Sequence, residues 1–139
     1  MPKGNGNVRR GRKKRTLDLK IPIKAISTNK LYSGKKMRSW YYKKYRKEIF
    51  KFLQANYPDP VTLSGNLVLD MEVGFSSPLS DASNSIKGVE DCVSEFYNFN
   101  DRQIVRIVCE KYLVHKGDEY THIRIRGTRK SYDKRRGKR

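Results

Sequence analysis

Acidic residues gather in the middle of this chain, between two strongly basic ends, and carboxylates in that setting can hold a metal ion. Residues 48–123 contain twelve Asp and Glu against six Lys and Arg, and Asp81, Asp91 and Asp101 are among the acids. Each carboxylate repels phosphate unless a positive group intervenes, and a divalent cation is the obvious mediator. Oxygen-ligated Mg²⁺ polarises a phosphoryl oxygen and acidifies bound water. The pattern indicates metal-assisted chemistry on phosphate, and the alternative is that these acids are solvated surface charges.

The net charge of +18 predicts a polyanionic partner. The surplus lies at the two ends, with +16 in residues 1–47 and +8 in residues 124–139. Residues 1–15 and 128–139 are too polar to bury a core, so we expect two disordered basic arms that order on DNA and flank a domain over 16–127. The expected DNA contacts come from the first arm and from a predicted helix over 39–55: Arg9, Arg10, Arg12, Lys13, Lys14, Arg15, Lys43, Lys44, Arg46 and Lys47.

Composition and length exclude several classes of protein. The 139 residues favour one domain, and no apolar run approaches the roughly 20 residues of a membrane span. The basic N-terminus lacks the apolar segment of a secretory signal. Cys92 and Cys109 form no Cys-x-x-Cys pair, and with only His115 and His122 beside them we expect no zinc site. We expect a reducing compartment such as the cytoplasm.

Hydrophobic periodicity predicts four strands and two helices. The predicted strands span 17–23, 66–75, 103–114 and 119–126, and the predicted helices span 39–55 and 82–97. The last two strands flank a turn that contains Gly117 and are expected to form a terminal hairpin. Trp40 and Tyr41, at the start of the first helix, either stack on unpaired bases or pack in the core or a dimer interface. The order of the elements predicts a small α+β domain with a mixed sheet.

The second predicted helix presents polar residues on the face opposite its apolar stripe. Asn84, Lys87 and Asp91 are three and four residues apart and therefore share that face. Asp81 precedes the first turn, where it could ligate a metal ion or cap the exposed amides. Asp101 follows the helix and is either a ligand or an ordinary loop carboxylate, and Lys87 alone could be a solvated lysine. None of these residues is specific when it is taken alone.

Taken in order, these residues resemble the signature of the RusA family of Holliday junction resolvases. That signature is an Asp-x-Asp-Asn-x-x-Lys-x-x-x-Asp helix start followed by an Asp-Asp-x-Gln turn. The residues that match it are Asp81, Asn84, Lys87, Asp91, Asp101 and Gln103. Upstream, IPIKAISTNKLYSG is similar to the family's Pro-x-x-x-Ser-x-Asn opening, with one more residue between Pro22 and Ser27, so the resemblance covers roughly 17–126. It implies an Mg²⁺-dependent endodeoxyribonuclease, with Mn²⁺ as an alternative ion, that acts as a homodimer and resolves four-way junctions by paired nicks in opposed strands.

The resemblance also implies roles for individual residues. Asp81 and Asp101 would hold the metal ion and, with Lys87, would be the catalytic residues. Lys87 would stabilise developing negative charge or orient the water. Asn84 would position a carboxylate or a bound water, and Gln103 would be a supporting or a structural residue. Because the intervening helix returns the chain, we expect Asp81 and Asp101 to converge.

Two positions depart from the family's pattern. Ser83 stands where the family has its second aspartate, and Asn100 stands where it has the first Asp of the Asp-Asp pair. A site that needs three carboxylates must then use another ligand, Asp91 or Glu72, although Glu72 could equally be a solvated strand residue. The alternative is a catalytically inactive protein of the same fold that binds junctions. A third hypothesis, a basic RNA-binding or ribosomal protein, explains the charge and leaves the ordered motif unexplained.

Overall fold

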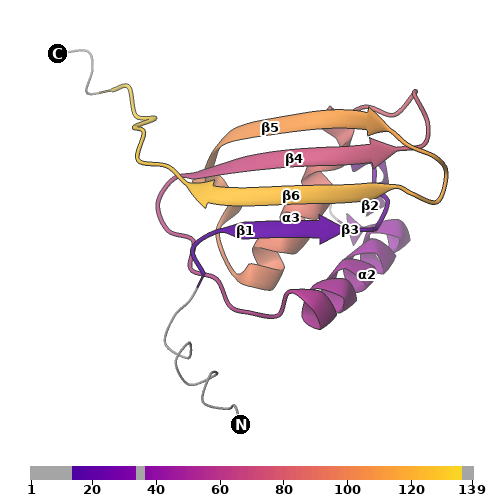
Figure 1. Cartoon of the computed structure of the whole chain (residues 1–139), viewed down its shortest axis with the longest axis horizontal. Coiled ribbons are helices and arrows are strands. Elements are labelled where there is room, and N and C mark those ends of the chain that lie inside the picture. The colour runs from indigo at the N-terminus through magenta and orange to yellow at the C-terminus, as the bar shows by residue number, and fades with distance from the viewer. Residues whose placement is uncertain (1–13, 34–36, 136–139) are drawn as a thin grey trace, which may run out of the picture.

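Four strands form a mixed sheet, and two helices cover one of its faces. The computed structural model describes residues 14–33 and 37–135. Its main elements are β1 (Leu17–Ile21), α2 (Trp40–Asn56), β4 (Leu67–Phe75), α3 (Ile86–Tyr97), β5 (Ile104–Leu113) and β6 (Tyr120–Gly127). The sheet order is β1-β6-β4-β5, with β4 parallel to β5 and β6 antiparallel to both of its neighbours (Figure 1). The expected α+β class is confirmed.

The last two strands do not form the expected hairpin, because β4 lies between them. β5 runs parallel to β4 after the crossover through α3, and β6 occupies the place between β4 and β1. The connection crosses the end of β4, where the Val114 amide donates a hydrogen bond of 2.8 Å to the Phe75 carbonyl. An apolar pattern shows that a segment is a strand and does not show its partner. The prediction was therefore right about the strands and wrong about their pairing.

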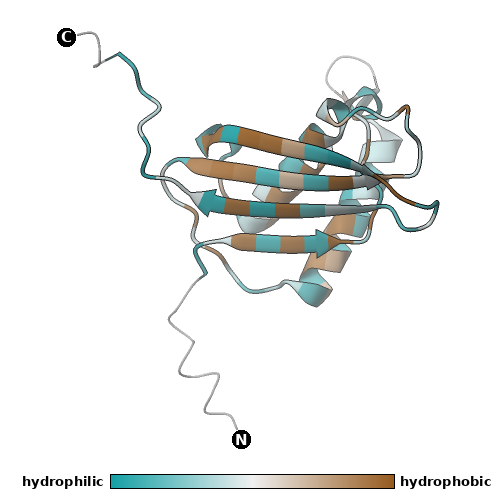
Figure 2. Ribbon diagram, turned by 45° about the horizontal axis from the view of Figure 1, so that its top comes forward, coloured by the Kyte–Doolittle hydropathy of each residue, from teal (hydrophilic) through white to brown (hydrophobic). Residues whose placement is uncertain are grey.

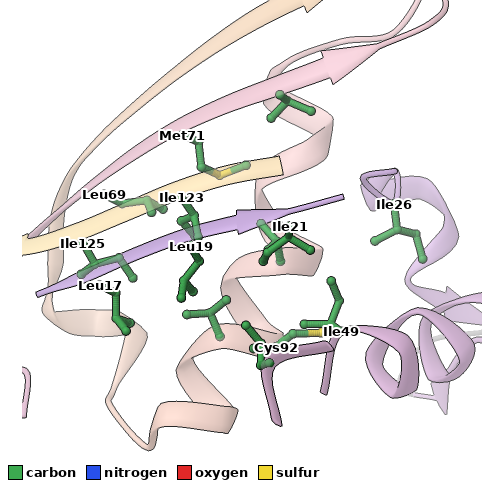
Figure 3. Packing of buried hydrophobic residues seen from close by; sticks show 14 of the residues in the cluster. Leu17, Leu19, Ile21, Ile26, Ile49, Leu69, Met71, Cys92, Ile123 and Ile125 are labelled. Carbon is green, nitrogen blue, oxygen red and sulfur yellow. The ribbon is translucent and has the colours of Figure 1, made fainter. Parts of the chain in front are cut away.

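The residues selected by the two periodicities form the core between the sheet and the helices. β1 alternates apolar and polar residues (Figure 2), and its apolar residues Leu17, Leu19 and Ile21 point toward the helices (Figure 3). The buried helical residues are Tyr42, Tyr45, Ile49 and Leu53 of α2 and Gly88, Val89, Cys92, Val93 and Tyr97 of α3. Burying one large aliphatic side chain stabilises a fold by about 1.5–3 kcal/mol. This layer therefore fixes both helices against the sheet.

The two helices begin in different ways. The hydroxyl of Ser39 accepts a hydrogen bond from an amide in the first turn of α2 and caps that helix. α3 begins at Ile86, four residues later than predicted, because residues 83–85 form a single 3₁₀ turn. In that turn the Asn84 amide donates to the Asp81 carbonyl at 3.2 Å. Asp81 thus contributes its backbone to the turn, and its side chain does not cap α3.

The segment before α2 contains a small antiparallel pair that the sequence did not predict. It consists of β2 (Tyr32–Ser33) and β3 (Met37–Arg38). Two-residue strands are too short to show a periodicity, so the sequence pattern does not predict them. The pair matters because it places Arg38 beside α3.

The ends of the chain are only partly covered by the structure. Residues 1–13 and 136–139 of the expected arms lie outside the described residues. Lys14 forms an isolated bridge with Val61, and residues 128–135 leave the sheet without helix or strand. Within the described ranges, none of the helices combines the length and the apolar character needed to cross a membrane.

Candidate active site

Three half-buried carboxylates meet beside the start of β5. Oxygen atoms of Glu90, Asp91 and Asp101 lie within 4.8 Å of one another, and this is the one such group found in residues 14–33 and 37–135. Glu90 and Asp91 are neighbours in α3, and Asp101 begins η3 (Asp101–Gln103), a 3₁₀ turn that leads into β5. We call Glu90, Asp91 and Asp101 the carboxylate cluster. All of its donor atoms are oxygens, which is the ligand type that Mg²⁺ prefers.

The ammonium group of Lys87 lies against this cluster. Its Nζ is 3.0 Å from an oxygen of Asp91, one helical turn away, and 3.6 Å from an oxygen of Asp101. The hydrogen bond to Asp91 raises the pKa of Lys87, and the charges of Glu90 and Asp101 also raise it. Lys87 therefore remains charged at neutral pH. The cluster thus already stabilises a positive charge, which supports its fit to a cation.

Arg38 of β3 makes a second contact to Asp91. Its Nη2 is 2.7 Å from the carboxylate oxygen that Lys87 does not contact, and its guanidinium lies 4.2 Å from the ring centre of Tyr42. Both oxygens of Asp91 therefore have a cationic partner, and only 10% of that side chain is exposed. This arrangement suits a residue that holds Lys87 in place better than one that binds metal. The sequence gave no signal for Arg38, which is 53 residues from Asp91 and outside the motif.

Glu90 is the member of the cluster that sequence reasoning missed. Burial raises the pKa of Glu90, and the charges of Asp101 and Asp91 raise it further, while Lys87 lowers it. Glu90 forms no salt bridge with any residue in the described part of the chain. Its position three residues after Lys87 places it on nearly the same helix face, and that spacing was the available signal. Its carboxylate is therefore better placed than that of Asp91 to bind an added ion.

The turn that carries Asp101 is fixed by the polar residues on either side of it. The Asn100 side chain accepts a hydrogen bond of 2.9 Å from an amide of the turn, and the Asn100 amide donates to Gln103 Oε1 at 3.0 Å. This reciprocal pair is a capping box. The Gln103 side-chain amide also donates to the carbonyls of Leu63 and Gly65 at 3.2 and 3.0 Å. Gln103 therefore has a structural role. Asn100, which replaces the first Asp of the family's Asp-Asp pair, caps the turn.

Asp81 lies apart from the carboxylate cluster. Its exposed carboxylate accepts a hydrogen bond of 3.3 Å from the side-chain amide of Asn84. The carbonyl of the next residue, Ala82, is 3.8 Å from Sγ of Cys109, near the middle of β5, whereas Asp101 precedes that strand. At about 3.3 Å per strand residue, the stretch from Ile104 to Cys109 alone spans about 16 Å, and Asp101 lies a further 3₁₀ turn away. Because β4 and β5 are parallel, Asp81 follows the end of one strand and Asp101 precedes the start of the other, so the expected convergence is not found within one chain.

Glu72 lies on the opposite face of the sheet from α3. Its neighbours in β4, Met71 and Val73, are buried in the core, so the strand's alternation turns Glu72 outward. Its carboxylate accepts a hydrogen bond of 2.5 Å from the hydroxyl of Tyr120 in β6. Because the sheet separates Glu72 from Asp101, the suggestion that Glu72 completes a metal site with Asp101 was wrong.

The basic residues expected to contact DNA fall into three groups. Arg46 donates two hydrogen bonds, of 3.0 and 2.6 Å, to Glu95 of α3, so its guanidinium joins the helices instead of facing a ligand. Three lysines are exposed on α2, and two further basic residues precede β1; these are Lys43, Lys44, Lys47, Lys14 and Arg15. The remaining residues, Arg9, Arg10, Arg12 and Lys13, lie outside the described part of the chain.

The two aromatic residues at the start of α2 face solvent. Trp40 and Tyr41 are 66% and 55% exposed, and their rings meet edge to face with centres 5.3 Å apart. The ammonium groups of Lys44 and Lys30 lie 5.5 and 5.2 Å from the ring centres of Trp40 and Tyr41, respectively. Packing in the core of the chain is therefore the wrong alternative for these residues. Contact with bases and contact with a second chain both stay open.

A small mixed-sheet domain that combines a basic helix with carboxylates around a lysine has the features of a nuclease. The family described as Endodeoxyribonuclease RusA matches residues 2–126 of the 139. The chain belongs to this family, whose members are endonucleases that resolve Holliday junctions. The match confirms the family that the ordered motif indicated. A search of the curated proteins found no match.

Proposed function

We propose that this protein is a metal-dependent, structure-selective endonuclease that resolves four-way DNA junctions by paired nicks in opposed strands. The observation that supports this most directly is the carboxylate cluster around Lys87 in a chain of the RusA family. The donors are carboxylate oxygens, and those of Asp91 and Asp101 already contact the Lys87 ammonium, so the cluster fits Mg²⁺ or Mn²⁺. We assign the ion to Asp101 and Glu90, with Asp91 as a third carboxylate beside them.

The chain's own residues have distinct roles in this proposal. When bound, the metal ion polarises the phosphate and acidifies a water molecule. Lys87 stabilises negative charge on the phosphate, while Asp91, held by Arg38, positions Lys87. Because the Lys87 ammonium is already desolvated on one side by the cluster, it reaches a phosphate at little reorganisation cost.

Asp81 requires a different argument, because it belongs to no cluster of three or more possible metal ligands in the described part of the chain. A four-way junction has approximate two-fold symmetry, and two nicks require two sites, which a symmetric homodimer supplies. In the proposed homodimer, a carboxylate of the second copy would complete the site around Asp81. We therefore keep Asp81 as a catalytic carboxylate, oriented by Asn84 through their 3.3 Å hydrogen bond.

A cleavage assay on a labelled four-way junction tests this function. The wild-type protein is expected to cut the junction with Mg²⁺ or Mn²⁺ and to leave it intact in a chelator, while a linear duplex of equal length is not cut. Asp81→Asn and Asp101→Asn should each abolish cleavage and keep or tighten junction binding, because each removes a negative charge that repels phosphate. Loss of binding in both variants would contradict the assigned roles.

A second candidate function is junction binding without cleavage. Two observations favour it: Ser83 replaces an expected aspartate, and Asp81 lies away from the cluster. In that case the wild type leaves junctions uncut in both metals, and Ser83→Asp restores cleavage. If the first proposal holds, Ser83→Asp changes metal affinity only modestly, because the cluster supplies its own carboxylates.

A further inference from the structure

A cavity of about 580 Å³ opens beside Asp81, on a part of the surface that the carboxylate cluster does not use. Three separate segments line it. Lys24 and Lys30 come from the region between β1 and β2, Tyr41 and Lys44 come from the first turns of α2, and Asp81 and Asn84 come from the segment before α3. We call this cavity the lysine groove.

The lysine groove is built to attract an anion and to stack a flat ring. Lys24, Lys30 and Lys44 form no salt bridge with any described residue, and these three lysines outnumber Glu48 and Asp81, the two carboxylates that line the same cavity. Tyr41 is 55% exposed, and the Lys30 ammonium lies 5.2 Å from its ring centre. An exposed aromatic ring beside lysines is the usual arrangement of sites that hold unpaired nucleotides.

The size of the cavity suits a single DNA strand better than a double helix. Its volume lies in the range of small-ligand sites, about 300–1,000 Å³. A cavity of that order accommodates a short stretch of a single strand. At a branch point the strands separate, so unpaired or unstacked nucleotides are available there.

We propose that the lysine groove holds a single DNA strand where it leaves the branch point of the junction. Phosphates contact Lys24, Lys30 and Lys44, and one base stacks on Tyr41. The strand then passes Asp81 and Asn84, the two motif residues that line the same cavity. This inference rests on the proposed function for its substrate, and it assigns recognition of the branch to residues outside the family motif.

Binding of forked DNA without metal tests the groove separately from cleavage. In a chelator, affinities are measured across a salt series for a fork with single-stranded arms and for a plain duplex of the same length. The double variant Lys24→Gln/Lys30→Gln should weaken fork binding and lower its salt slope by about 1.4, since each contact to a single strand contributes about 0.7. The matched double variant Lys20→Gln/Lys116→Gln removes the same charge from exposed lysines that do not line the cavity.

Base stacking has its own measurement. A fork that carries 2-aminopurine at the branch should lose fluorescence when the wild type binds, and Tyr41→Leu should restore that fluorescence and weaken fork binding about tenfold. Tyr112→Leu is the control, because Tyr112 is 47% exposed and belongs to β5, away from the groove.

Each outcome separates this inference from the proposed function. If the groove variants lose no more affinity for the fork than their controls, the groove assignment is overturned, even when the enzyme cuts junctions. If the groove variants fail on the fork and keep duplex binding, the groove assignment holds, even when the wild type cuts nothing in Mg²⁺ or Mn²⁺.

Discussion

Asp91 is expected to stabilise the fold more than it binds metal, and the substitution Asp91→Asn tests this. The change keeps the shape of the side chain and removes its charge. It leaves Arg38, stacked on Tyr42, and Lys87 without their shared anion. The structure therefore predicts a loss of stability that does not depend on any added ion.

The size of the loss follows from the burial of the three partners. Removing one partner of a buried ion pair costs about 3–5 kcal/mol, whereas exposed pairs contribute about 0–1 kcal/mol. Asp91 is 10% exposed, but Arg38 and Lys87 are 30% and 45% exposed, so water partly screens the pairs. We expect a loss of about 2 kcal/mol, which lowers Tm by about 8 °C for a domain of this size.

Thermal unfolding followed by circular dichroism in a chelator measures this loss. The matched control is Glu95→Gln, which breaks the other contact between an arginine and α3. Because Arg46 and Glu95 are 38% and 53% exposed, that variant should lose less than about 1 kcal/mol. Equal Tm values for the two variants would refute the reasoning. So would a loss that occurs only when Mg²⁺ is present, since Asp91 would then act as a metal ligand.

Three further predictions follow from the site and the arms. Burial raises the pKa of Glu90 above its ordinary 4.5, so ionisation of Glu90 destabilises the folded state as pH rises. Glu90→Gln should therefore be more stable to urea than the wild type at pH 7, and the two should be equally stable below about pH 4. Gln103→Ala removes three hydrogen bonds to the backbone and should lower the free energy of unfolding by about 1–3 kcal/mol. The control Gln54→Ala, at an exposed position of α2, should change that free energy little. Deletion of residues 1–13, which spares the hydrogen bond from the Thr62 amide to the Lys14 carbonyl, removes five basic residues and should flatten the salt dependence of junction binding, with about 0.9 lost per phosphate contact. An unchanged slope would show that the arm makes no contact with DNA.

The positions of the long helices and strands could be predicted because the apolar residues of each follow a regular spacing in the sequence. The apolar spacing of α2 and the alternation of β1 and β4 placed those elements to within a few residues. The sheet order could not be predicted in this way. The insertion of β6 between β1 and β4 depends on the crossover through α3, which brings β5 parallel to β4. That constraint acts between distant segments and leaves no mark on the pattern of any one strand.

The contacts of the candidate site also fall into those that the sequence predicts and those that depend on the fold. Lys87 and Asp91 are one helical turn apart, so their contact follows from the sequence alone. Arg38 reaches Asp91 only because a two-residue strand places it there, and no motif contains it. The separation of Asp81 from Asp101 depends on the parallel pairing of β4 with β5, because Asp81 follows β4 and Asp101 precedes β5. Spacing within a motif shows which residues occur together and not how far apart the fold holds them.

The position of Ser83 shows why its departure from the family's pattern need not remove the metal site. Ser83 begins the 3₁₀ turn that follows Asp81, so it belongs to the Asp81 end of the molecule and not to the carboxylate cluster. The cluster has three carboxylates of its own, and the cations that contact it are Lys87 and Arg38. An aspartate at position 83 would therefore add its charge beside Asp81 and not to the carboxylate cluster. The serine at position 83 therefore leaves the negative charge around Lys87 intact.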